Sequence, residues 1–236
     1  MGYTELRLDL ILATLRRLQS RIQERFPDSG LSRIAAELHR VAEETGPILE
    51  RARRPNLLVR VGVGIGLALV LAFLVGLVVL IRSLSFELGG LGAFMQGTES
   101  ATQNVIFLAI VVYFLVTLEG RIKRRAALQE LHKLRSVIHI VDMHQLTKDP
   151  DHLVGAGKET ASSPERKLPR FEMSRYLDYC AELLSLSSKL AALHLQSVND
   201  PVVLDAVSDV EELASDLAGR IWQKIMIVDR GLAGEG

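Results

Sequence analysis

Residues 61–81 form an apolar run of 21 positions without a single ionisable side chain. As an α-helix rising about 1.5 Å per residue, the run is about 31 Å long, which matches the hydrocarbon thickness of a bilayer. A second apolar run, residues 105–118, gives only about 21 Å of helix, so a span there has to start further back, near residue 101. The sequence therefore predicts an integral membrane protein with two spans, residues 57–82 and 101–119. A short external loop, residues 83–100, is expected to join them into a transmembrane hairpin.

Basic residues near the span ends predict the orientation of this hairpin, because they resist translocation. The connection between the spans holds only Arg82, against Glu87 and Glu99. Four basic residues precede the first apolar run and four follow the second: Arg51, Arg53, Arg54, Arg60, Arg121, Lys123, Arg124 and Arg125. We therefore expect both termini to be cytoplasmic. The excess of Arg over Lys is typical of GC-rich bacterial genomes, so the expected location is a bacterial inner membrane.

Residues 1–55 show the spacing of two amphipathic helices. Apolar side chains recur every three or four residues, which places them on one face of a helix. The first stripe is Leu8, Ile11, Leu15, Leu18, Ile22 and Phe26, and the second is Leu31, Ile34, Leu38, Val41 and Ile48. Residues 27–30 break the pattern between them, and a kink is expected near Gly46 and Pro47. The sequence predicts a cytoplasmic αα-hairpin that needs a packing partner for its stripes.

The chain after the second span repeats the amphipathic pattern. A cytoplasmic helix over residues 120–148 is expected to continue from that span, with Leu134 and Ile138 on its apolar face. Residues 149–170 are rich in Gly, Ser, Pro and charge, which predicts a flexible loop. Residues 171–236 then form a C-terminal helix pair, whose second helix has Asp200 as its N-cap and Pro201 as its first residue. The expected fold is all-α, with the N- and C-terminal helices forming one cytoplasmic bundle of coiled-coil-like packing.

Histidine and aspartate side chains gather near the end of the predicted helix 120–148. His132, His139 and Asp142 lie within about 80° of one another on a helix. His139 and Asp142 have the i, i+3 spacing at which two ligands can meet one ion, so these three are the candidate metal ligands. Polar residues that border an apolar stripe are the commoner explanation of this pattern. The sequence therefore predicts no cofactor.

Small residues follow one face of the first span. They are Gly64, Ala68, Ala72 and Gly76, with Gly62 and Gly66 as a parallel pair. A groove of small side chains lets two helices approach closely in lipid, where association depends on van der Waals contact. We expect this groove to be filled by the second span or by a neighbouring subunit.

Charge balance and residue patterns exclude several classes of function. Lys and Arg number 28, as do Asp and Glu, so no net charge favours binding to nucleic acid. Cys180 is the only cysteine, which excludes an internal disulfide and a cysteine-based zinc site. No nucleophile stands in a recognisable arrangement with a base, so we do not expect an enzyme.

Three functional classes remain, and an enzyme centred on the cluster of histidine and aspartate side chains ranks third, after the two that follow. The first is a non-enzymatic, membrane-anchored scaffold or adaptor, which contacts the lipid bilayer and binds a second copy or another protein at the cytoplasmic face. The alternative is an oligomeric ion channel or small transport subunit, with a pore at the polar outer end of the second span near Gln103 and Asn104.

Overall fold

The computed structural model describes residues 5–83, 91–146, 148 and 168–233. Within these ranges the chain is helical and no β-strand occurs. The elements are α1 (Leu8–Arg25), α2 (Gly30–Arg53), α3 (Leu57–Ser83), α4 (Leu91–Leu146), α6 (Arg170–Ala192), the 3-10 helix η1 (Leu193–Gln196) and α7 (Pro201–Ala233). The all-α prediction is confirmed for this part of the chain. Most of the predicted loop 149–170 lies outside the described residues.

The chain divides into two compact units. Residues 1–53 and 124–236 form the first, here called the core unit, and residues 54–123 form the second, here called the apolar unit. The core unit therefore takes its helices from both sides of the apolar unit in the sequence: α1 and α2 come before it, and the end of α4, α6 and α7 come after it.

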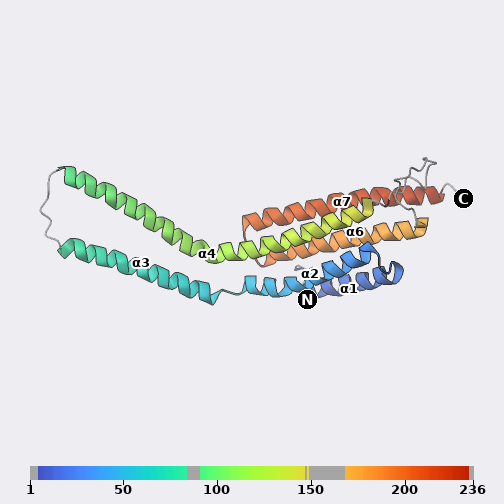
Figure 1. Ribbon diagram of the computed structural model, residues 1–236, viewed down its shortest axis with the longest axis horizontal. Coiled ribbons are helices and arrows are strands. Elements are labelled where there is room, and N and C mark those ends of the chain that lie inside the picture. The colour runs from blue at the N-terminus through green and yellow to red at the C-terminus, as the bar shows by residue number, and fades with distance from the viewer. Residues whose placement is uncertain (1–4, 84–90, 147, 149–167, 234–236) are drawn as a thin grey trace. The chain divides into compact units, whose positions relative to one another are not determined.

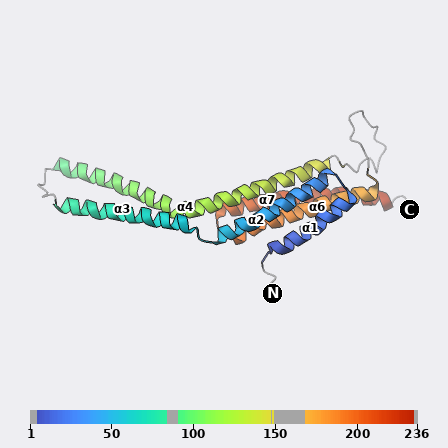
Figure 2. The ribbon, with the colours of Figure 1, turned by 60° about the horizontal axis from the view of Figure 1, so that its bottom comes forward.

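Within the core unit, α1 and α2 lie side by side and run antiparallel (Figures 1 and 2). Arg16 Nε donates to His39 Nε2 at 3.2 Å, which joins the middle of the two helices. The predicted break between them is confirmed. Asp28 there adopts the left-handed region with φ of 56°, which Asp tolerates better than most residues, and Ser29 Oγ caps α2 by accepting the Ser32 N–H at 3.1 Å.

Polar contacts at its two ends show that α7 runs parallel to the last part of α4. Arg124 pairs with Asp200 at 2.6 Å where α7 begins, and Lys224 Nζ donates to Gln145 Oε1 at 2.7 Å where α4 ends. The Asp200 carboxylate also accepts the backbone N–H of Val202 at 3.0 Å, so the predicted N-cap is confirmed.

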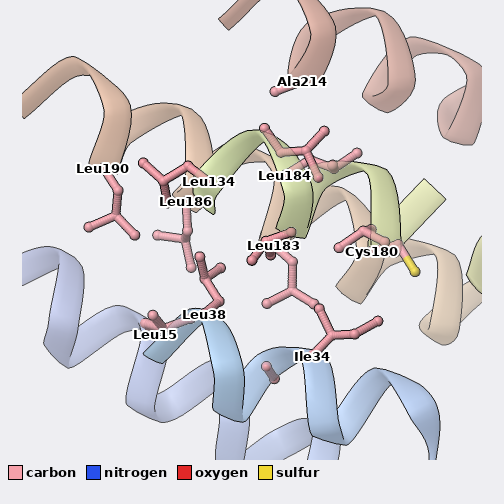
Figure 3. Close-up of a cluster of buried hydrophobic side chains, with 14 of the residues drawn as sticks. Leu15, Ile34, Leu38, Leu134, Cys180, Leu183, Leu184, Leu186, Leu190 and Ala214 are labelled. Atoms are coloured by element: carbon pink, nitrogen blue, oxygen red, sulfur yellow. The ribbon is translucent and has the colours of Figure 1, made fainter. Parts of the chain in front are cut away.

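One hydrophobic core joins all five long helices of the core unit. Figure 3 shows Leu15 of α1, Leu38 of α2, Leu134 of α4 and Leu184 of α6 in this cluster, and each side chain is fully buried. The burial of Leu15, Leu38 and Leu134 confirms the apolar stripes predicted for their helices. Fully burying a Leu side chain contributes about 1.5–3 kcal/mol, so this shared core is the main source of stability for the unit.

The predicted stripe of α2 needs one correction, because Leu49 is buried and Ile48 is only partly buried. With about 100° per residue counted from Leu38, position 49 lies about 20° from the centre of the stripe and position 48 about 80° away. The helix also continues through Pro47 to Arg53.

In the apolar unit, α3 spans Leu57–Ser83, close to the predicted 57–82. α4 begins at Leu91, inside the predicted loop 83–100, and it continues without a break through residue 120. The stretch after Gly90 contains no proline and is rich in helix-compatible residues, so the helix starts earlier than the second apolar run. Two helices of the described chain are long and apolar enough to cross a membrane, and neither apolar segment is buried within the protein. Leu58, for example, is 85% exposed.

Candidate functional site

The three candidate metal ligands lie on the surface of α4. His132 and His139 are exposed, and Asp142 Oδ1 accepts a hydrogen bond from Gln145 Nε2 at 2.7 Å. Among the described residues no group of three or more His, Cys, Asp or Glu side chains could hold a metal ion. The nearby His144 instead packs its ring on Gly30 of α2, where an added Cβ would lie 2.2 Å from Nε2. This histidine serves the contact between two helices.

The small residues of α3 divide into two sets. A Cβ added at Gly66 would lie 3.0 Å from Leu115 Cδ1 of α4, so this glycine is part of the contact between the two apolar helices. Gly62, Gly64 and Gly76 have open space where a Cβ would stand. Ala68 and Ala72 are exposed as well. Of the glycines predicted for this groove, only Gly66 therefore meets the second apolar helix of the same chain.

Glu119 organises the polar contacts at one end of the apolar unit. Its carboxylate accepts from Arg60 Nε at 2.9 Å and from the backbone N–H of Asn56 at 3.2 Å, and it pairs with Lys123 at 3.0 Å. These bonds join the start of α3 to α4. A carboxylate with two cationic partners and a backbone donor is fully used in holding the helices together.

Cys180 is fully buried in the core unit, and burial raises the pKa of its thiol to about 12. The thiolate is the reactive form of cysteine, so this side chain is chemically inert at neutral pH. It acts as a small apolar residue of α6, as Figure 3 shows.

His194 is a buried polar residue that the sequence did not single out. It lies in η1 with 1% of its surface exposed, and burial lowers the pKa of its imidazole to about 4. Its Nε2 and the neighbouring Ser197 Oγ are buried with no hydrogen-bond partner in the described part of the chain. The imidazole is therefore neutral at physiological pH. No nucleophile or second base bonds to it there, so it shows no catalytic arrangement.

A cavity of about 630 Å³ opens beside η1, between the start of α1 and the end of α2. Leu6, Leu49 and Leu193 form part of its apolar wall. Its charged side chains carry both signs, and Arg7 Nε donates to Asp9 Oδ1 at 3.1 Å within it. Because acidic and basic side chains both line the cavity, it shows no strong preference for a charged ligand of either sign.

Exposed apolar side chains interrupt the polar surface of α7. Trp222 and Met226 stand one helical turn apart and are 58% and 47% exposed. Because large exposed aromatic and Met side chains are enriched at protein interfaces, this pair is the best candidate binding surface of the core unit. These two residues could have been found from the sequence, because they are large apolar residues at positions of α7 that lie outside its apolar stripe.

Comparisons with models of protein families, with characterised proteins and with solved structures gave no match. The class of protein defined here is an all-helical chain with two helices that are long and apolar enough to cross a membrane.

Proposed function

We propose that this chain is a non-enzymatic, membrane-anchored helical scaffold or adaptor. In this proposal α3 and the first part of α4 form a transmembrane hairpin in a bacterial inner membrane. Both termini are cytoplasmic, and the core unit is a cytoplasmic helical bundle that binds a second copy of the chain or another protein.

The main support for this proposal is that helices from both sides of the apolar unit in the sequence contribute residues to one hydrophobic core. Leu15 and Leu38 come from helices before the apolar unit, and Leu134, Leu184 and Val210 come from helices after it, yet all belong to one buried cluster. A chain that leaves this cluster through one apolar helix and returns to it through another has both flanks on the same side of a bilayer. The excess of Arg and Lys beside the spans favours the cytoplasmic side.

Two buried hydroxyl groups of the core unit support a structural role. Thr45 Oγ1 donates to Val41 O at 2.9 Å, and Ser187 Oγ donates to Leu183 O at the same distance, so both hydroxyls are satisfied within their own helices. Such bonds stabilise the fold and supply no reactive group. The exposed Trp222 and Met226 then provide the surface on which a partner would dock.

The alternative channel has less support. Gln103 and Asn104, the polar residues expected to line a pore, are exposed in the single chain. Reconstituting the purified chain in liposomes separates the two functions: a scaffold gives ion flux equal to that of empty liposomes. Reproducible conductance that is lost on changing Gln103 and Asn104 to Ala would replace the scaffold with the channel.

A photo-cross-linking amino acid at position 222 tests the binding surface directly. In native membranes we expect discrete adducts from this position and none from the same amino acid at Arg17, an exposed site on α1. An adduct of twice the chain mass identifies a second copy as the partner. Equal labelling from both positions, or none from position 222, contradicts the assignment of this surface.

A further inference from the structure

Two arginines of the core unit that lie far from the apolar unit in the sequence pair with carboxylates of another helix. Arg21 pairs with Glu182 at 2.6 Å, and Arg25 pairs with Glu172 at 3.0 Å. Each of these guanidinium groups holds two helices together. Their charge is neutralised within the protein, so they do not attract an external anion.

Beside the apolar unit the balance of charge is different. Residues 51–60 and 119–125 contain eight basic residues and a single acid, Glu119. Arg60 and Lys123 both form ion pairs with Glu119, and Arg124 forms an ion pair with Asp200. The nearby carboxylates are therefore already used.

Four exposed arginines are left without a carboxylate among the described residues, and we call them the juxtamembrane arginines: Arg51, Arg53, Arg121 and Arg125. Two lie just before α3 and two lie just after the second apolar run. The Arg121 guanidinium lies 5.4 Å from the centre of the Phe114 ring and 6.0 Å from that of Tyr113. This stacking holds its charge beside the aromatic end of the apolar segment.

The chemistry of these groups matches a phosphate. A guanidinium presents several N–H donors in a planar fork, which binds two oxygens of a phosphate at once. Residues next to a membrane span lie at the level of the lipid headgroups, so the phosphate groups nearest to these arginines are those of the lipids. Each basic side chain next to a span strengthens attraction to anionic lipid about fivefold.

We propose that the juxtamembrane arginines bind the phosphate headgroups of anionic lipids. The inference rests on the proposed function in one respect, namely that α3 and α4 lie in a membrane. In this proposal, phosphatidylglycerol or a similar anionic lipid is a bound partner of this chain.

Native mass spectrometry of the purified full chain in detergent tests the proposal. Phosphatidylglycerol is added and compared with phosphatidylcholine of the same acyl chains. The variants are Arg51→Gln with Arg53→Gln, and Arg121→Gln with Arg125→Gln. The matched control is Arg17→Gln with Arg220→Gln, which removes two exposed arginines that also lack a carboxylate in the described residues but lie far from the spans in sequence.

The native chain is expected to retain phosphatidylglycerol in preference to phosphatidylcholine. Each juxtamembrane pair should lower binding about 25-fold, since two groups contribute about fivefold each, whereas the control pair stays within about twofold. Raising the salt concentration should weaken the binding, because exposed charges are screened. Replacement by Lys keeps the charge but loses the planar fork, so Arg51→Lys with Arg53→Lys should retain more binding than the Gln pair. This comparison keeps the test valid even if the Gln pair disturbs folding.

Three results would overturn the proposal. The first is equal binding of both lipids by the native chain, and the second is a loss of binding in the control variant as large as in the juxtamembrane variants. The third is displacement of the lipid by soluble glycerol phosphate at equal concentration. The last result would make a free phosphate ester the ligand. This detergent assay does not depend on how the chain is oriented in a membrane. An inverted hairpin, detected by labelling in cells, would therefore contradict the proposed topology and not the lipid-binding proposal.

Discussion

Replacing Leu15 by Ala tests whether the two flanks of the apolar unit share one core. Leu15 is fully buried on α1, and truncating a buried Leu to Ala costs about 2–5 kcal/mol. In a unit of this size each kcal/mol lowers the melting temperature by about 2–4 °C, so the expected decrease is about 4–20 °C. The matched control is Leu10→Ala on the same helix, since Leu10 is 57% exposed and should change stability by less than about 0.5 kcal/mol.

The assay combines far-UV circular dichroism with the fluorescence of Trp222, the only tryptophan. Trp222 lies on α7, whereas the mutation lies on α1. If both helices belong to one cooperative unit, Leu15→Ala shifts the fluorescence transition and the dichroism transition together. A shift in dichroism alone, with an unchanged Trp222 transition, would show that the flanks are separate modules and would refute the shared core.

Three further predictions follow from single residues. Gly66→Leu should lower the melting temperature of the full chain in detergent because its side chain meets Leu115, whereas Gly64→Leu should leave the monomer unchanged and alter only its association. Cys180 should react with N-ethylmaleimide only on unfolding, because the thiol is buried and its pKa is raised to about 12. The unfolding free energy should fall by about 3 kcal/mol as the pH drops from about 6.5 to about 4, since buried His194 has a pKa lowered to about 4 and resists the proton that the unfolded chain accepts.

Each of these predictions has a control. Equal melting temperatures for Gly66→Leu and the native chain would place α3 and α4 apart at that position. Fast alkylation of Cys180 in the native chain would mean that the core of α6 opens readily. His194→Leu should remove this part of the pH dependence, whereas His132→Leu, at an exposed site, should keep it. An unchanged slope in His194→Leu would assign the acid sensitivity to other groups.

Helical periodicity alone was enough to predict which faces of the core helices are buried. Leu15, Leu38 and Leu134 were expected on apolar stripes and are fully buried. The break between the first two helices at residues 27–30 and the start of the last helix at Asp200 could be predicted from local turn and capping chemistry, which depends on neighbouring residues only. The prediction placed Ile48 on the buried face of α2, whereas the structure buries Leu49. Spacings of three and four residues only approximate the 3.6-residue period of an α-helix, so the error in angular position grows along the helix.

Contacts between helices could not be predicted in the same way. The approach of His144 to Gly30 and the bond from Lys224 to Gln145 join residues that are far apart in the sequence, and no local pattern marks them. The groove on α3 shows the same limit. The spacing of the small residues indicated a surface for close contact, but of the glycines predicted there only Gly66 meets α4 within the chain, and the spacing did not single it out.

Labelling of single cysteines in intact cells tests the central claim most directly, namely that a hairpin holds both flanks on the cytoplasmic side. Native Cys180 is first changed to Ala, and a cysteine is then placed at Gly90, Arg17 or Arg220 in three separate variants. A membrane-impermeant maleimide should label the variant with cysteine at position 90 in intact cells, and should label the other two only after the membrane is permeabilised. Labelling of position 17 or 220 in intact cells, with position 90 protected, would contradict the account.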